Sequence, residues 1–121
     1  RDGNAIWAVG ENLDANGIAP EQFEVIQGNI IDDKQIQEWA GYEAYDSVTS
    51  NILADVIIPL VDVIPAHLKE GGYFITSGII NMKEEAVKAA FAANSAFAVE
   101  EITYQGELVS ITARKIPRRG R

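Results

Sequence analysis

One short stretch, Asn51-Ile52-Leu53-Ala54-Asp55, has both the residue types and the position to do chemistry. It follows a strand-like run, residues 45–50, and precedes a long apolar, helix-like run, residues 56–68. A polar residue at the carboxyl end of a strand, just before a helix, is where open α/β sheets place their ligands. Asn51 is therefore the candidate functional residue. The alternative is that it caps the following helix, a position that favours Asn.

Few other residues offer chemistry. Cysteine is absent, which excludes disulfides, Cys-bound metals and Cys nucleophiles and fits a cytoplasmic protein. We expect His67, the single histidine, to be a surface or packing residue, and we expect no metal site. No apolar run reaches the ~18 residues of a membrane span, because Pro59, Asp62 and Pro65 interrupt the best candidate. These absences are consistent with an enzyme that works by positioning, and equally with no enzyme.

The order of the expected elements predicts an α/β fold. Ile6, Val9 and Leu13 recur at helical spacing between a possible cap at Asn4 and a stop at Asn16-Gly17. Further helices are expected over residues 35–40, 54–68 and 83–93. Strands are expected over residues 23–27, 45–50, 73–76, 97–104 and 108–115. A turn is expected over residues 69–72 and a hairpin link over residues 105–107. Because proline is unfavourable inside a helix, the helix over 54–68 should be kinked or divided. Helices should flank a mostly parallel sheet that ends in an antiparallel strand pair.

Several short motifs stand in order along the chain: Asp2-Gly3-Asn4-Ala5-Ile6, Glu11-Asn12, Asn16-Gly17, Tyr45-Asp46, Asn51-Ile52-Leu53-Ala54, Leu68-Lys69-Glu70-Gly71-Gly72-Tyr73, Ser77-Gly78-Ile79, Gly106-Glu107 and Ala113-Arg114-Lys115. In order and spacing they resemble the motifs of a known family, the methyltransferases of the PrmA type. These are class I enzymes that use S-adenosylmethionine to modify a protein of the large ribosomal subunit. The resemblance covers about residues 2–115.

The resemblance implies a Rossmann-like sheet that lacks its first two strands. Residues 1–115 would be a partial catalytic domain, and residues 116–121 a basic tail. The missing strands would lie between the strand at residues 23–27 and the strand at residues 45–50. Three ways of closing that gap stay open: the two strands pair directly, another copy fills it, or upstream chain does. Exposed strand edges favour pairing with another copy, so a homodimer is one expectation.

The resemblance also implies roles for individual residues. Asn51 matches the family's Asn near the methyl-donor end of S-adenosylmethionine. Asn29, after Gly28, lies where many class I enzymes place a residue near the adenine, and Asp2 matches the second acid of the family's D-x-D. In a methyl transfer, the Asn51 amide oxygen and the backbone carbonyls of Ile52, Leu53 and Ala54 would orient the lone pair of a neutral amine, either a lysine or an N-terminal amine. We expect the chain alone to bind the cofactor weakly and to be inactive.

Charge indicates the kind of partner. The net charge is −8, but residues 114–121 hold five of the ten basic residues and no acidic one. Residues 1–113 therefore carry five basic against eighteen acidic residues, a net charge of −13. An acidic body favours a basic protein and disfavours nucleic acid, except through the tail at 114–121. The alternatives are a class I methyltransferase for RNA or a small molecule, and a non-catalytic interaction module.

Overall fold

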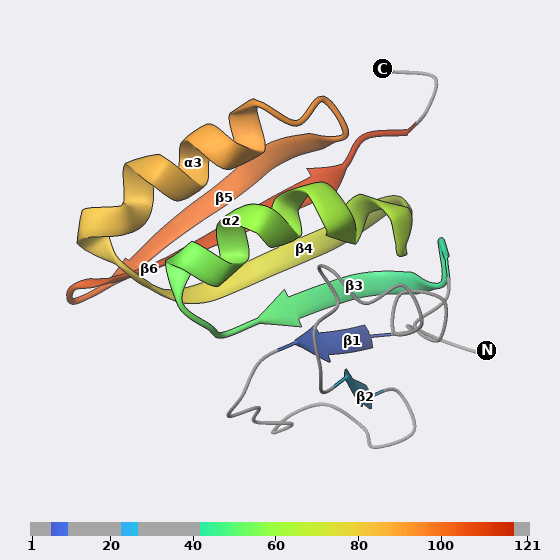
Figure 1. Cartoon of the computed structure of the whole chain (residues 1–121), viewed down its shortest axis with the longest axis horizontal. Helices are drawn as coiled ribbons and strands as arrows, with labels where there is room; N and C mark the ends of the chain where they lie inside the picture. The colour runs from blue at the N-terminus through green and yellow to red at the C-terminus, as the bar shows by residue number, and fades with distance from the viewer. Residues whose placement is uncertain (1–5, 10–22, 27–41, 118–121) are drawn as a thin grey trace.

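The computed structural model describes residues 6–9, 23–26 and 42–117, and of the first two segments only the strands themselves. Its elements follow the labels of Figure 1. They are β1 (Ile6–Val9), β2 (Phe23–Ile26), β3 (Tyr45–Ser50), α2 (Ala54–Val63), the 3-10 turn η2 (Ile64–Ala66), β4 (Leu68–Ile80), the 3-10 turn η3 (Asn81–Lys83), α3 (Glu84–Ala92), β5 (Phe97–Gln105) and β6 (Leu108–Lys115).

The strands form one six-stranded sheet in the order β2-β1-β3-β4-β6-β5. Neighbours from β2 to β4 are parallel, while β6 runs antiparallel to both β4 and β5. Both described helices lie over the same face of this sheet (Figure 1). The predicted α/β class, with a mostly parallel sheet and an antiparallel strand pair at its C-terminal end, is confirmed.

The segment Ile6–Val9 corrects the sequence analysis. It was expected to be helical, yet it forms β1, with β2 on one side and β3 on the other. The gap expected between residues 23–27 and 45–50 is therefore filled from within the chain, by none of the three routes considered. Four consecutive apolar residues are typical of a central parallel strand. Pairing with a strand on each side satisfies the backbone N–H and C=O groups of Ile6–Val9, and this outweighs the weak helical spacing. The expected cap at Asn4, the stop at Asn16-Gly17 and the helix over 35–40 lie outside the described residues.

The helix after Asn51 is divided, as predicted. α2 runs from Ala54 to Val63 with Pro59 inside it, and the chain then tightens into η2, where Pro65 occupies the first turn. A proline in a first turn removes an N–H that has no helical partner, so Pro65 is tolerated there. Within the described part of the chain, neither helix is long and apolar enough to cross a membrane.

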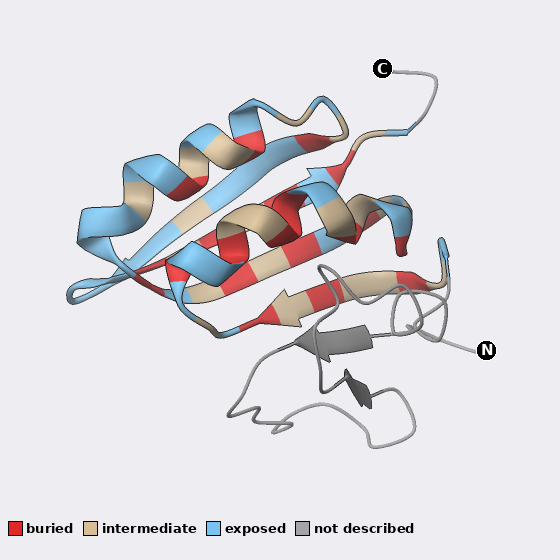
Figure 2. Cartoon of the chain, viewed as in Figure 1, coloured by how far each residue is buried: buried red, intermediate tan, exposed pale blue. Residues whose placement is uncertain are grey.

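The core lies between the sheet and its two helices (Figure 2). α2 contributes Ile57, Leu60 and Val61, all fully buried. α3 is anchored by Phe91, whose ring centroid lies 5.8 Å from that of Phe74 in β4 and 5.4 Å from that of Phe97 in β5. Edge-to-face aromatic contacts of this kind stabilise a core by about 0.5–1.5 kcal/mol beyond the burial itself. This packing fixes α2, and therefore the loop before it, against the sheet.

The predicted turn at Lys69–Gly72 is instead a bulge within β4. Four residues, Lys69 to Gly72, lie opposite the single residue Asp46 of β3. Gly71 has a φ of 81°, and a Cβ on Gly72 would come within 2.8 Å of the Asp46 carbonyl oxygen. The two glycines are needed because one takes a left-handed conformation and the other touches backbone. After the bulge, Tyr73 to Thr76 pair regularly with β3, as the predicted strand requires.

Two buried polar side chains hold the amino-terminal end of β4. Lys115 is 3% exposed, and its Nζ donates hydrogen bonds to the carbonyl oxygens of Pro65 at 2.7 Å and Leu68 at 2.8 Å. His67 is also buried and stacks on Tyr42 with ring centroids 5.2 Å apart. His67 is therefore a packing residue, one of the two roles predicted. Lys115 belongs to the folded domain, so it is not available to a basic tail.

Candidate functional site

Asn51 follows β3 directly, at the carboxyl end of the parallel part of the sheet. The four residues that start there alternate in burial. Asn51 and Leu53 are exposed, Ile52 packs against the core, and Ala54 is buried as the first residue of α2. Ile52 and Ala54 therefore anchor the loop to the core. This anchoring holds the Asn51 side chain at the edge of the sheet, as predicted.

The helix-cap alternative for Asn51 is wrong. The N-cap of α2 is Leu53, and no side chain makes a capping hydrogen bond there. The Leu53 carbonyl oxygen accepts the backbone N–H groups of Val56 at 2.9 Å and Ile57 at 3.1 Å. The carbonyl oxygen of Leu53 is therefore occupied by the first turn of α2. The carbonyl groups of Asn51 and Ile52 accept no hydrogen bond within the part of the chain that the structure describes.

A second bulge in β4 lies beside Asn51. Ser77 and Gly78 together face the single residue Ser110 of β6, since Thr76 pairs with Ile111 and Ile79 with Val109. Gly78 has a φ of 73°, and a Cβ added to it would overlap the Oδ1 atom of Asn51 and lie 3.5 Å from its Cγ. Bulges of this type redirect a strand and are frequent beside active sites. Glycine here gives the Asn51 amide the space that it occupies.

The ends of β3 and β4 are joined at the same point. The Ser77 hydroxyl donates a hydrogen bond to the Ser50 carbonyl oxygen at 3.3 Å. The Ser50 side chain is 2% exposed, and its Oγ is the one buried side-chain polar atom of the described residues that has no hydrogen-bond partner. An unsatisfied buried hydroxyl is unusual in a folded protein and is more frequent at functional positions.

These elements enclose a hollow of about 490 Å³. Its lining comes from the β3–α2 loop, the β4 bulge and the β5–β6 hairpin: Asn51, Ser77, Gly78, Thr103, Tyr104, Gln105, Leu108 and Ser110. This volume is in the range of small-molecule sites, and the lining carries several hydroxyl and amide groups. A hollow at the carboxyl ends of parallel strands is also where this class of sheet binds ligands.

The hairpin residues of this lining were not predicted from the sequence. Thr103, Gln105 and Ser110 occupy alternate positions in β5 and β6, a pattern that also marks an ordinary solvent-facing side of a strand. The one part of the sequence that could have indicated this lining is Ser77-Gly78. It follows the regular part of β4 in the same way as Asn51 follows β3.

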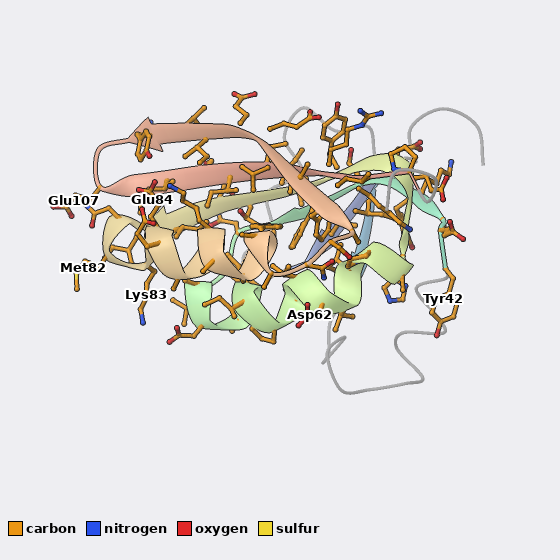
Figure 3. All side chains as sticks on the ribbon, turned by 90° about the horizontal axis from the view of Figure 1, so that it is seen from above. Tyr42, Asp62, Met82, Lys83, Glu84 and Glu107 are labelled. Carbon is orange, nitrogen blue, oxygen red and sulfur yellow. The ribbon has the colours of Figure 1, made fainter. Side chains whose placement is uncertain are left out.

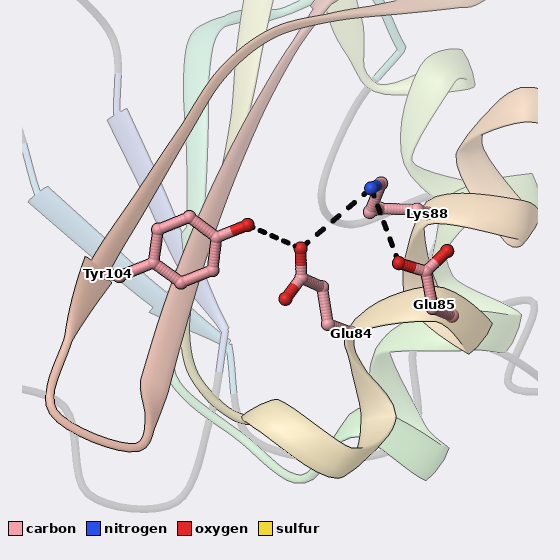
Figure 4. Close-up of polar contacts among 4 residues, drawn as sticks. All are labelled: Glu84, Glu85, Lys88 and Tyr104. Atoms are coloured by element: carbon pink, nitrogen blue, oxygen red, sulfur yellow. Dashed lines mark hydrogen bonds and ion pairs between the residues drawn. The ribbon is translucent and has the colours of Figure 1, made fainter.

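Charged side chains of α3 lie beside the β5–β6 hairpin (Figure 4). The Tyr104 hydroxyl donates a hydrogen bond to Glu84 Oε2 at 2.6 Å. Lys88 Nζ lies 3.8 Å from the same oxygen and 3.5 Å from Glu85 Oε1. The hydrogen bond to Glu84, together with the negative charges of Glu84 and Glu85, raises the pKa of Tyr104 above its ordinary value. Tyr104 is therefore a neutral group that links the hairpin to α3.

The other predicted site residues, Asp2, Gly28 and Asn29, lie outside the described residues. The structure therefore brings together Asn51, Ile52, Leu53 and Ala54 from the predicted set. The described residues hold no group of three His, Asp or Glu side chains that could bind a metal ion.

Two solved structures resemble this one. A predicted O-methyltransferase from Agrobacterium tumefaciens has a TM-score of 0.71 at 18% sequence identity, over 95% of this chain and 75% of that chain. A ribosomal protein L11 methylase from Lactobacillus delbrueckii subsp. bulgaricus has a TM-score of 0.57 at 26% identity, over 61% of this chain and 38% of that chain. The fold, with a hollow at the carboxyl ends of its parallel strands, is that of the class I methyltransferases.

Sequence similarity gives the family. The chain belongs to the family described as ribosomal protein L11 methyltransferase (PrmA), which it matches over residues 1–116. The L11 methyltransferase of Lachnospira eligens is 54% identical over 114 residues, which are 94% of this chain and 36% of that protein. The one of Agathobacter rectalis is 49% identical over 115 residues, 95% of this chain and 35% of that protein. The chain thus spans about a third of the length of these relatives.

Proposed function

We propose that this chain supplies the methyl-acceptor side of the active site in an enzyme that methylates amino groups of ribosomal protein L11. The observation that carries the proposal is the position of Asn51, whose amide oxygen lies over Gly78 at the carboxyl edge of the sheet. The proposed substrate is inferred from the names of the relatives, which are L11 methyltransferases. The target is a lysine side chain or an N-terminal amine.

S-adenosylmethionine is the proposed methyl donor, and when bound it supplies a sulfonium methyl group to a nucleophile. The residues present suit such a group, because the hollow of about 490 Å³ beside Asn51 is lined by hydroxyl and amide groups. Asn51 would lie near the methyl end of the donor. Asp2, Gly28 and Asn29 would hold its other parts, as the family resemblance implies.

The described residues act by positioning the acceptor. An amine attacks the methyl carbon only when it is neutral, and its lone pair must be in line with the sulfur–carbon bond that breaks. The amide oxygen of Asn51 and the carbonyl oxygens of Asn51 and Ile52 can accept the N–H hydrogens of that amine and so orient the lone pair. Leu53 and Ala54 leave the predicted set. The Leu53 carbonyl oxygen already accepts two hydrogen bonds from α2, and Ala54 is buried as the first residue of that helix. As the N–CH₃ bond forms, a proton leaves the nitrogen for solvent.

The test uses the full gene product that contains this chain. It is incubated with S-adenosylmethionine and purified L11. The L11 is then digested with a protease, and the masses of its peptides are measured by mass spectrometry. Methyl groups are expected on lysine side chains or on the terminal amine. The control is L11 whose amines have been acetylated beforehand, which should gain no methyl group. Methylation of acetylated L11 to the same extent would contradict the amine assignment, and unmodified native L11 would contradict the proposed substrate.

A further inference from the structure

Exposed apolar side chains gather at the edge of the sheet that holds Asn51. The described residues include nine large hydrophobic side chains that are exposed, and six of them come from this edge. Tyr104 contacts Glu84. The other five form what we call the apolar rim: Leu53, Val56, Ile80, Met82 and Leu108. Scattered exposed hydrophobic residues need no explanation, but a group of them beside a ligand hollow indicates an interaction surface.

The residues of the rim come from three parts of the chain, and these parts are joined to one another. Ile80 pairs with Leu108 across the β4–β6 ladder. The Asn81 backbone N–H donates a hydrogen bond to the Glu107 carbonyl oxygen at 2.8 Å, which joins η3 to the hairpin. Lys83 Nζ lies 3.4 Å from Asp55 Oδ1, which joins η3 to the start of α2. The labelled residues Met82, Lys83, Glu84 and Glu107 accordingly gather at one end of the molecule in Figure 3.

The most exposed members of the rim contribute little to the core. Met82 is 83% exposed and Leu53 is 76% exposed. Leu53 lies two residues after Asn51, and Leu108 lines the hollow itself. An apolar side chain of the rim therefore borders the hollow. Flexible methionine is well suited to such a place, because it adapts to differently shaped partners.

Charge around the rim indicates the kind of partner. Four carboxylates, those of Asp55, Glu84, Glu85 and Glu107, lie on these elements against two ammonium groups, Lys83 and Lys88. The net charge of these six side chains is negative, as is the net charge of residues 1–113 as a whole. Such a field attracts a positively charged segment and repels the phosphates of RNA.

We propose that the apolar rim is the docking surface for the segment of the substrate protein that carries the target amine. This proposal rests on the proposed function and adds the chemistry of the recognised segment. The segment carries positive charge, and it places apolar side chains beside the target amine. Those side chains pack on Met82, Ile80 and Val56, while the target amine reaches Asn51 in the hollow.

The test compares one rim variant, which combines two substitutions, with one control variant of the full gene product. Met82→Ser and Ile80→Thr each remove apolar surface from the rim, and neither residue takes part in positioning the amine. Val99→Thr is the matched control, since Val99 is 39% exposed and lies toward the other end of β5. The substitution of Ile80 and that of Val99 both keep a branched side chain, which protects the strands.

The first readout is steady-state methylation of L11. The combined Met82→Ser and Ile80→Thr variant is expected to raise KM for L11 about tenfold, which corresponds to roughly 1.4 kcal/mol. Its kcat and its KM for S-adenosylmethionine should stay within about twofold of the parent values. Added salt should raise KM for L11 in the parent, because screening weakens the attraction of the acidic edge for a basic segment. The Val99→Thr control should leave all three constants unchanged.

The second readout is the affinity for L11 without methyl transfer, measured by calorimetry on the same variants. A Kd that rises about tenfold in the rim variant alone supports the docking surface, even if no methyl group is transferred and the proposed function fails. Efficient methylation of L11 with the same KM and Kd in the rim variant and the control would overturn the docking surface and leave the proposed function standing. If L11 neither binds nor is methylated, both proposals fail.

Discussion

The contact between Gly78 and Asn51 gives the sharpest prediction. In the Gly78→Ala variant, the new Cβ would overlap Asn51 Oδ1, and residue 78 would keep a φ of 73°. The left-handed conformation costs about 1–2 kcal/mol for alanine. The overlap itself should cost little, because the atom met is the end of an exposed side chain that can rotate away. The expected result is therefore a modest loss of stability with a large loss of activity.

Gly106 supplies the matched control. Its φ is 62°, and a Cβ added there meets nothing within 4 Å. Gly106→Ala should therefore lose the same ~1–2 kcal/mol of unfolding free energy, which is roughly 2–8 °C in Tm for a protein longer than this chain. Only Gly78→Ala displaces Asn51. Because misplacement of a positioning group by about 1 Å can lower a rate about 100-fold, its kcat for L11 should fall 10- to 100-fold.

The assay combines thermal denaturation with steady-state methylation of L11 by the full gene product. Equal Tm losses in the two glycine variants, with the loss of kcat confined to Gly78→Ala, would support the reasoning. Equal kcat values would show that the position of Asn51 over Gly78 is irrelevant to the reaction. A Tm loss in Gly78→Ala far beyond that of Gly106→Ala would show that Asn51 cannot move aside, and would refute the energetic argument.

Two further predictions concern stability. Lys115→Met removes the donor to two largely buried carbonyl oxygens, so the unfolding free energy should fall by about 2–4 kcal/mol. Lys69→Met removes a half-exposed ion pair with Asp46 and should lose less than about 1 kcal/mol in chemical denaturation; equal losses would contradict this account of Lys115. Because its folded-state pKa is raised, Tyr104 contributes stability that is fully present below about pH 10, the ordinary tyrosine pKa, and is lost as pH rises through the folded-state pKa. Between about pH 7 and pH 9 the Tm difference between the parent and Tyr104→Phe should therefore stay constant, and it should shrink at higher pH; a difference that already shrinks between pH 7 and pH 9 would count against this account of Tyr104.

Local sequence patterns predicted most elements of the described fold. Two prolines spaced within one apolar run predicted the divided helix of α2 and η2, and the link at Gly106 predicted the β5–β6 hairpin. Ile6–Val9 was missed because four apolar residues suit a helix or a buried strand equally, and long-range pairing with β2 and β3 decides between them. Tertiary pairing of this kind leaves no signal in the local spacing.

The site was predictable only in part, for a related reason. Asn51 was found because its position after a strand and before a helix can be read from neighbouring residues. Its capping role was a reasonable expectation for Asn, but the N-cap of the helix lies two residues later, at Leu53. The contact with Gly78 depends on a bulge that joins residues 27 positions apart in sequence, and the hairpin side of the hollow depends on the β4–β6 register. Register between distant strands is not encoded in any short motif.

The most direct test of the central claim is the single-turnover rate of methyl transfer to L11, with enzyme and S-adenosylmethionine in saturating excess over L11. The account predicts that Asn51→Ala lowers this rate about 100-fold while Tm changes by less than a few degrees, since the Asn51 side chain is exposed and does not cap α2. An Asn51→Ala variant that transfers the methyl group at the parent rate would show that this edge of the sheet does not position the acceptor.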